Sequence, residues 1–355
     1  MNQPLAPLQI GKHTVPYPIL QGAMGVRVSG AKLASAVANA GGIGIIASAG
    51  LGLKSPYYRK MRFPLANRLA LIDELRNARQ ISPEGVIGVN VWVAAKDYLI
   101  SAQTAAEYGA NLVVTEAGLP FLLPQCMKQY PHVALVPTVS NFEDAKRLCE
   151  MWRKEYSRFP DALIVENAKG IGGHLGARLD IAQVLTQLRD YLENDLGIQI
   201  PLIVTGGIWD RNDINQILAL GANGVQIGTR FITTEECDAD LRYKLFHLQA
   251  KPKDLVIVPS PVGKSGRAIR NEFAEKAIAG SSEIEQRCIA NCLESCLCRD
   301  AKKTYCLLQG LANASSGDLG NGLVFSGANA GRCDRIVSVT ELMTELVKTR
   351  STVTV

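Results

Sequence analysis

The stretch Leu202-Ile203-Val204-Thr205-Gly206-Gly207 joins a short β-branched run directly to a glycine pair, and Gly224-Val225-Gln226-Ile227-Gly228-Thr229 repeats that arrangement. A β-branched run that ends in glycine is typical of a buried parallel strand followed by a tight turn into a helix. Backbone N–H groups at such a turn can approach an anion closely, because glycine has no side chain in the way. One such turn alone is common for steric reasons, but two in succession predict a phosphate site.

Six further runs of the same kind come before these two, so the chain carries eight predicted strands. They are Tyr17–Gly22, Ile43–Ala47, Ile87–Trp92, Leu112–Glu116, Ala134–Val139, Ala162–Glu166, Leu202–Thr205 and Gly224–Gly228. Segments with helical apolar periodicity alternate with them: Ala31–Ala40, Leu65–Gln80, Asp97–Tyr108, Phe142–Tyr156, Ile181–Glu193 and Asp213–Leu220. Asn141 with Asp144, and Asp210 with Asp213, place short polar side chains at helix starts. Eight units predict an α/β fold of the TIM (β/α)8 barrel type, with a doubly wound open sheet as the alternative.

The alternation stops after Leu248. We therefore predict a barrel over residues 1–250 and a C-terminal appendage over residues 251–355 that contains a cysteine cluster and a final helix. Because no long linker precedes it, the appendage is expected to pack on the barrel mouth. A length of 355 residues suits one barrel with such an addition, and 47% apolar with 20% charged residues excludes disordered and fibrous classes.

Charge and targeting signals narrow the expected partners. The N-terminus Met1-Asn2-Gln3-Pro4 has no signal-peptide pattern and no apolar run could span a bilayer, so we expect a cytoplasmic protein without a membrane partner. A net charge of +5 is too small to predict nucleic-acid binding. The densest basic stretch could be a solvated loop or a dock for an acidic protein. Its residues are Lys54, Arg59, Lys60 and Arg62, with Lys264, Arg267 and Arg270 as further candidates.

In β/α barrels the active site lies at the carboxyl ends of the strands. At the first strand, Gln21, Gly22, Ala23 and Met24 would let a flat ring lie against the backbone, although a tight turn explains them equally. Polar residues at the ends of the third and fourth strands, Asn90 and Glu116, could contact the edge of that ring. The turns after the last two strands supply the remaining candidates, which are Gly206, Gly207, Gln226, Gly228 and Thr229.

Of the four histidines, only His174 lies among glycines at a strand end, in Gly170-Ile171-Gly172-Gly173-His174-Leu175-Gly176. An imidazole with a pKa near neutrality can take a carbon-bound proton beside a carbonyl or nitro group and later return it. We therefore interpret His174 as a catalytic base, with Gly173 beside the cofactor. His13, His132 and His247 lack such surroundings and are expected to be structural.

Cys288, Cys292 and Cys296 follow one another at i, i+4 and i+8, which on a helix would place them on one face. With Cys306 folding back, C-x3-C-x3-C-x9-C offers the four ligands of an iron-sulfur cluster or a zinc site, and Cys298 is left over. A buried apolar cysteine stripe is the alternative. Nearby basic residues could offset the negative charge of metal-bound thiolates. These residues are Arg287, Arg299, Lys302 and Lys303.

Several of these motifs resemble one family. Pro18–Met24, Gly172–Gly176, Thr205–Ile208 and Gly228–Phe231 are similar to signatures of the nitronate monooxygenase (2-nitropropane dioxygenase) family, to which enoyl-ACP reductase FabK also belongs. The resemblance implies FMN on a TIM barrel and a catalytic histidine at position 174. The cysteine spacing, with Pro261–Gly263, Arg267–Ile269 and Gly327–Asn329, resembles the FabX-type acyl-ACP dehydrogenase/isomerases, which implies a 4Fe-4S cluster besides FMN.

This resemblance implies an FMN-dependent oxidoreductase of unsaturated fatty acid biosynthesis, which converts saturated acyl-ACP to trans-2- and then cis-3-enoyl-ACP. The alternatives are a nitronate monooxygenase that oxidises alkyl nitronates with O2, a FabK-like enoyl-ACP reductase, and a non-catalytic FMN- or zinc-binding protein. The expected partners are acyl carrier protein or another acyl thioester, O2 as electron acceptor, and a second copy of the chain in a homodimer.

Overall fold

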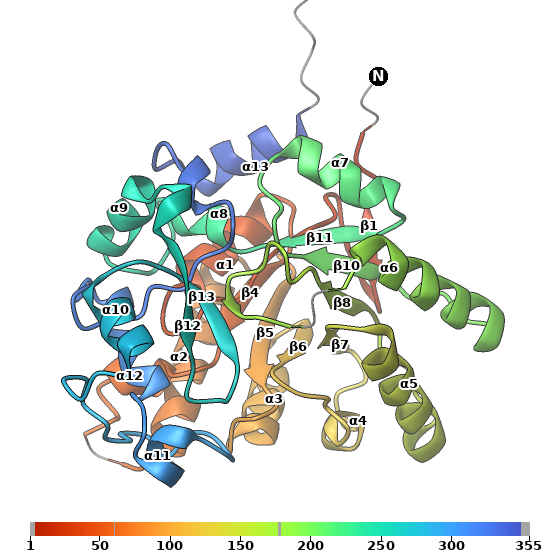
Figure 1. Cartoon of the computed structure of the whole chain (residues 1–355). Helices are drawn as coiled ribbons and strands as arrows, with labels where there is room; N and C mark the ends of the chain where they lie inside the picture. The colour runs from red at the N-terminus through yellow and green to blue at the C-terminus, as the bar shows by residue number, and fades with distance from the viewer. Residues whose placement is uncertain (1–3, 60, 177–178, 349–355) are drawn as a thin grey trace, which may run out of the picture.

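A barrel of eight parallel strands forms the centre of the computed structural model, which describes residues 4–59, 61–176 and 179–348 (Figure 1). The strands are β3 (Ile19–Gln21), β4 (Gly44–Ala47), β5 (Ile87–Trp92), β6 (Leu112–Glu116), β7 (Ala134–Val139), β8 (Leu163–Glu166), β10 (Leu202–Thr205) and β11 (Gly224–Ile227). Neighbours in the sheet follow the chain order, and β11 lies beside β3. Each predicted strand is present, with ends that differ by two residues or fewer.

The sheet closes between β3 and β4. Leu20 and Ile43 form a parallel bridge, the N–H of Gln21 donates to the carbonyl of Ile43 at 2.9 Å, and the N–H of Ile43 donates to Ile19 at 3.0 Å. The Gln21 side chain adds to this seam, because its Oε1 accepts a hydrogen bond from the N–H of Ile45 at 3.0 Å. The closed barrel is confirmed, and the open-sheet alternative is wrong.

Helices alternate with the strands and cover the outside of the barrel. They are α1 (Ala31–Asn39), α2 (Phe63–Ile81), α3 (Tyr98–Glu107), α4 (Leu123–Cys126), α5 (Phe142–Tyr156), α6 (Ile181–Asp190), α7 (Arg211–Ala219) and α8 (Thr229–Ile232). Both predicted caps are present: Asn141 accepts from the N–H of Asp144, and Asp210 and Asp213 form a capping box. In the described ranges no helix is both long and apolar enough to cross a membrane.

A hairpin that the sequence pattern did not predict covers the amino-terminal end of the barrel. Its strands, β1 (Leu8–Ile10) and β2 (His13–Val15), pair antiparallel and have three residues each, too few to show an alternation. Leu8, Ile10 and Val15 join the apolar cluster that fills the barrel interior. The amino-terminal end of the barrel is therefore sealed, and the carboxyl end is left for a site.

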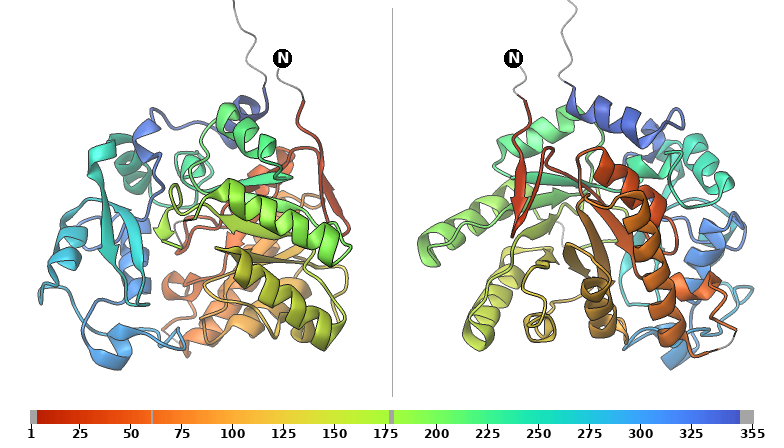
Figure 2. Two further views of the ribbon diagram at one scale, coloured as in Figure 1. Left: turned by 45° about the vertical axis from the view of Figure 1, so that its right-hand side comes forward. Right: turned by 180° about the vertical axis from the view of Figure 1, so that it is seen from behind.

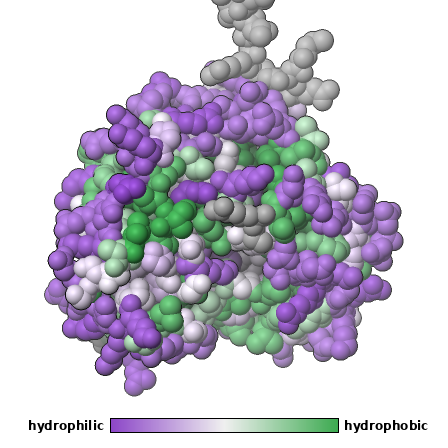
Figure 3. All heavy atoms as spheres, in the orientation of Figure 1, coloured by the Kyte–Doolittle hydropathy of each residue, from purple (hydrophilic) through white to green (hydrophobic). Residues whose placement is uncertain are grey.

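The chain after the barrel forms a second layer beside the barrel mouth (Figure 2). It contains α9 (Leu241–Gln249), β12 (Leu255–Pro259), β13 (Ser265–Ile269), α10 (Glu272–Ala279), α11 (Leu297–Ala301), α12 (Leu307–Ser315) and α13 (Val339–Val347). The hairpin β12–β13 adds β9 (Gly173–His174) as a third antiparallel strand. Figure 3 shows a mostly hydrophilic surface with apolar patches, and Ile257 on β12 is 44% exposed.

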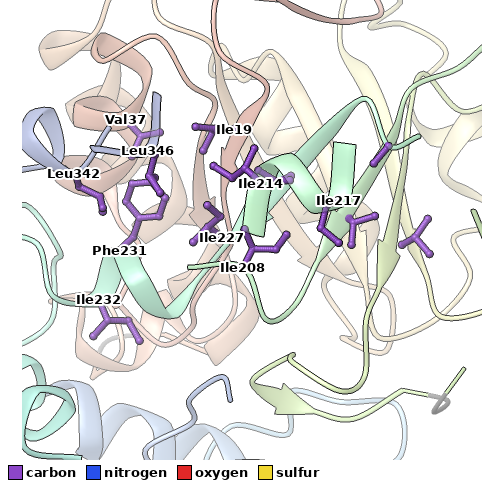
Figure 4. Packing of buried hydrophobic residues seen from close by; sticks show 14 of the residues in the cluster. Ile19, Val37, Ile208, Ile214, Ile217, Ile227, Phe231, Ile232, Leu342 and Leu346 are labelled. Atoms are coloured by element: carbon purple, nitrogen blue, oxygen red, sulfur yellow. The ribbon is translucent and has the colours of Figure 1, made fainter. Parts of the chain in front are cut away.

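The last helix returns to the barrel wall. Leu342 and Leu346 of α13 lie against Phe231 and Val37, deep in an apolar cluster (Figure 4). An ion pair between Arg230 and Glu345, with nitrogen and oxygen 2.9 Å apart, lies at the same contact. The segment after residue 250 is thus attached at the mouth through β13 and at the wall through α13, and backbone hydrogen bonds also join Cys292 and Glu294 to Lys96 and Ala94 of the barrel.

Substitution of Gly44 on β4 tests how closely α1 packs on the barrel. A Cβ at this position would lie 1.8 Å from the carbonyl oxygen of Ala34, so strand and helix must separate to admit it. We expect Gly44→Ala to lower the free energy of unfolding by about 3 kcal/mol, measured by denaturant titration. As control, Gly320→Ala should change stability by less than about 0.5 kcal/mol, since its nearest neighbour would be 3.7 Å away. Equal stability of both variants would contradict this packing.

Candidate active site

A cavity of about 420 Å³ opens at the carboxyl ends of the barrel strands. This volume lies within the range of about 300–1,000 Å³ that small-molecule and cofactor sites occupy. Its lining includes every predicted cofactor and catalytic residue except Gln21, namely Gly22, Ala23, Met24, Asn90, Glu116, Gly173, His174, Gly206, Gly207, Gln226, Gly228 and Thr229. The structure therefore brings the predicted barrel residues together, and it places Gln21 in the seam below them.

The two glycine turns predicted to hold phosphate lie side by side and are covered by a later loop. Gly206 and Gly207 have φ angles of +107° and +81°, which favour glycine. The N–H of Gly327 donates to Oγ1 of Thr229 at 2.8 Å, and Nδ2 of Asn329 donates to the carbonyl of Gly207 at 2.8 Å. The segment 326–329 thereby closes over both turns.

Ser326 lies in this loop, and sequence reasoning did not select it. Its side chain is 2% exposed, lines the cavity and has a hydroxyl without a hydrogen-bond partner. A buried polar group of this kind is ordinarily satisfied, so Ser326 has free capacity for a ligand atom beside the glycine turns. In the sequence, only the next three residues, Gly327-Ala328-Asn329, pointed to this loop, through their resemblance to the FabX-type enzymes.

Two further polar groups in the cavity are available to a ligand. Oγ1 of Thr138, 8% exposed, makes no hydrogen bond, and Nδ2 of Asn90, 1% exposed, has only the Glu116 carboxyl beside it, whose pKa it lowers. Around them stand apolar side chains from both the barrel and the later segment: Met24, Trp92, Leu293, Leu307, Leu311 and Phe325. A flat ring with polar edges and a phosphate tail fits this set of groups, and FMN has that form.

His174 stands at one side of the cavity on β9. Its Nε2 lies 2.6 Å from Oγ of Ser260, and its ring packs edge-on against Phe325 with centroids 5.3 Å apart. Burial lowers the pKa of His174 to about 4, and the positive charge of Lys264 contributes in the same direction. The imidazole is therefore neutral at neutral pH and able to accept a proton.

The remaining histidines lie away from the cavity. His247 is completely buried on α9, with Nδ1 3.0 Å from the carbonyl of Tyr243. Nε2 of His13 lies 3.0 Å from the carbonyl of His132 at the opposite end of the barrel. These contacts join the rings to backbone carbonyls outside the cavity.

Two carboxyl groups share the cavity with His174. Burial and the nearby charge of Glu166 raise the pKa of Glu116 to about 7. Burial also raises the pKa of Glu166, which accepts a hydrogen bond from the Ser140 hydroxyl, whereas Lys264 lowers it. Glu166 was not predicted as a site residue, although it ends a barrel strand just as Glu116 does, so the same rule would have found it.

The helical arrangement predicted for the cysteines is wrong. Cys288, Cys292 and Cys296 lie on an irregular loop, and Cys306 lies at the start of α12. The thiols are nevertheless neighbours: burial raises the pKa of Cys292 to about 12, with contributions from Cys306, Cys288 and Cys296. Cys298 has three of these thiols as neighbours too. Across the described ranges, however, no three His, Cys, Asp or Glu side chains are arranged to hold a metal ion.

Comparisons with known proteins identify relatives of the whole chain. The family model for nitronate monooxygenase matches residues 6–349. A probable nitronate monooxygenase of Staphylococcus saprophyticus is 28% identical over 82% of this chain and 86% of its own length. A (3aS,4S,5R,7aS)-5-hydroxy-7a-methyl-1-oxo-octahydro-1H-indene-4-carboxyl-CoA dehydrogenase of Mycobacterium tuberculosis is 29% identical over 75% and 67%. The solved FabK of Thermotoga maritima superposes with a TM-score of 0.73 at 25% identity, covering 94% of this chain and 92% of that one.

The low pKa of His174 can be measured by NMR titration of histidine-labelled protein. We expect a pKa near 4 rather than 6.5, and a higher pKa in Lys264→Met, because a nearby positive charge is removed. The matched control is Lys253→Met, which replaces an exposed lysine that does not line the cavity.

The low pKa of His174 also makes the stability of the fold depend on pH. Since His174 binds a proton at a higher pH in the unfolded chain than in the folded one, the free energy of unfolding should fall as pH drops from about 6.5 towards 4. Titration of His174 near 6.5 would contradict the buried site.

Proposed function

Because the chain belongs to the nitronate monooxygenase family of flavin-dependent oxidoreductases, we propose that it is an FMN-dependent acyl-ACP dehydrogenase and isomerase. The observation that carries the proposal is one cavity in which a neutral imidazole, an FMN-sized space and an apolar wall meet. The apolar wall comes partly from the segment after residue 250, through Leu307, Leu311 and Phe325. Such a wall suits an acyl chain better than a small nitronate.

The residues that would hold FMN divide into two groups. The glycine turns Gly206–Gly207 and Gly228–Thr229, with the free hydroxyl of Ser326, would bind the phosphate. Met24 would cover the ring, while the Asn90 amide and the unpartnered Thr138 hydroxyl would bind its polar edge. When bound, FMN would supply a two-electron acceptor for a hydride.

His174 would carry the proton transfers. In dehydrogenation its imidazole removes the proton from the carbon beside the thioester carbonyl while a hydride leaves the next carbon, which gives the trans-2 alkene. In isomerisation the same base removes a proton from carbon 4, and a proton returns to carbon 2, so the double bond moves to the cis-3 position. The dehydrogenation balances if O2 accepts the two electrons and two protons removed from the substrate and becomes hydrogen peroxide.

The comparisons support thioester chemistry and one competing function. The M. tuberculosis relative is named as a dehydrogenase of a CoA ester. The S. saprophyticus relative is named a probable nitronate monooxygenase. Its name favours a second candidate function, in which the same cavity oxidises alkyl nitronates.

Substrate turnover separates these two functions. We expect saturated acyl-ACP to bleach the flavin absorbance anaerobically and to yield trans-2 and cis-3 alkenes, and we expect His174→Gln to slow this by about 10²–10⁴-fold with FMN still bound. His132→Gln, at an exposed position, is the matched control and should behave as wild type. Turnover of propionate 3-nitronate without any alkene from acyl-ACP would reject the proposal in favour of the second candidate.

We propose that acidic acyl carrier protein docks on a basic surface formed by Lys54, Arg59 and Arg62, which are all exposed. Lys60 lies outside the described residues. Two other predicted docking residues are occupied within the chain: Arg270 pairs with Glu275, and Arg267 donates to the carbonyl of Ile171. Comparing acyl-ACP with acyl-CoA as substrates shows whether the carrier protein contributes to binding.

We also propose that Cys288, Cys292, Cys296 and Cys306 hold a 4Fe-4S cluster, with zinc as the lesser alternative. Backbone N–H groups already point at these sulfurs, as in thiolate sites: that of Asn291 lies 3.3 Å from Cys288, and those of Ile289 and Gln309 bond to Cys306. The proposed reaction needs no step at this centre.

Metal analysis of protein purified without oxygen tests the cluster. We expect iron and acid-labile sulfide in about equal amounts, lost in Cys292→Ser because one of four ligands is removed. Cys126→Ser is the matched control, since Cys126 lies on α4 and bonds to the carbonyl of Leu99. Zinc without sulfide would show the alternative, and protein free of metal would contradict both.

A further inference from the structure

The strand that carries His174 is fixed by the chain after the barrel. Gly266 of β13 pairs with His174 and Arg267 pairs with Gly173, and the N–H of Leu175 donates to the carbonyl of Ser265 at 2.9 Å. The turn between β12 and β13 is itself closed by hydrogen bonds. The N–H of Ser260 donates to the carbonyl of Lys264 at 2.9 Å, and the N–H of Gly263 donates to that of Ser260 at 3.0 Å.

Ser260 stands behind the imidazole. Its side chain is 5% exposed and does not line the cavity, whereas His174 does. Its Oγ lies 2.6 Å from Nε2 of His174, which is a short hydrogen bond between well-placed groups. Among the described residues, no group hydrogen-bonds to the other ring nitrogen, Nδ1. Ser260 can therefore act on the substrate only through the ring, and the free nitrogen is Nδ1.

We propose that Ser260 is a positioning residue that keeps the proton of neutral His174 on Nε2 and leaves the Nδ1 lone pair as the base; this rests on the proposed role of His174. In this tautomer Nε2–H donates to the Ser260 hydroxyl. When Nδ1 accepts a proton from the substrate carbon, Nε2–H keeps the same hydrogen bond, so the imidazolium forms without rearrangement. The opposite tautomer would place N–H at Nδ1, where no proton could be accepted.

The test uses FMN-loaded protein labelled with nitrogen-15 in histidine, in which NMR identifies the protonated nitrogen directly. We expect wild type and Ser260→Thr to hold His174 with the proton on Nε2, and Ser260→Ala to lose that preference. The kcat for acyl-ACP should fall about 10- to 100-fold in Ser260→Ala with little change in KM, and the Thr variant should recover it. Ser265→Ala, an exposed serine of the same hairpin, is the matched control.

The tautomer readout separates this inference from the proposed function. A proton on Nδ1 in wild type, or an unchanged tautomer in Ser260→Ala, would overturn the role of Ser260 whatever the substrate proves to be. A shifted tautomer in Ser260→Ala together with no turnover of acyl-ACP by wild type would support the positioning role and reject the acyl-ACP function. If Ser260→Ala does not fold, Ser260→Cys replaces it, and an unchanged tautomer there would likewise overturn the inference.

Discussion

The antiparallel pairing of β9 with β13 is the contact on which the site depends. His174 stands in a stretch of glycines, and such a stretch has little conformational preference of its own. Two backbone partners on β13 and the hydroxyl of Ser260 give the imidazole one direction. His174 therefore lies on a barrel segment but is oriented by a hairpin some ninety residues further along the chain, so the later segment forms part of the candidate site.

Desolvation sets the protonation of the site. Burial is the largest cause both of the low pKa of His174, about 4, and of the high pKa of Glu116, about 7. Both shifts favour the uncharged form, as expected where water is excluded. A flat cofactor in the cavity would remove more water and push both groups further in the same directions. At neutral pH the cavity thus combines a neutral imidazole with a carboxyl group that can hold a proton, and two groups of that kind can exchange protons with a ligand.

The sequence was most informative where local pattern and final structure obey the same rule. The strands of a parallel barrel are buried on both faces, so they appear in the sequence as continuous apolar runs. A run such as Leu112–Glu116 therefore predicts both the strand and its ends. Strands β1, β2 and β9, of two or three residues each, have no pattern to recognise, whereas the equally short β3 lies within a longer predicted run, Tyr17–Gly22. The cysteine loop misled because i, i+4 spacing allows a helix without requiring one. Its backbone instead bonds to the barrel: the N–H of Lys96 donates to Cys292, and the N–H of Glu294 to Ala94.

Gln21 and Asn90 show why a polar residue at a strand end is an ambiguous signal. Both were predicted as cofactor residues, Gln21 as part of a turn against which a flat ring could lie and Asn90 as a polar strand end, and both are almost completely buried. The fold already uses the Gln21 amide: its oxygen accepts from the N–H of Ile45 across the β3–β4 seam, and its nitrogen donates to the carbonyl of the adjacent Gly22, so it completes the barrel below the cavity. The Asn90 amide nitrogen has only the Glu116 carboxyl beside it in the cavity, and the hydroxyls of Thr138 and Ser326 have no partner. A buried polar group that the fold leaves unsatisfied reserves its hydrogen bond for a ligand, and only the three-dimensional structure separates it from one that the fold has used.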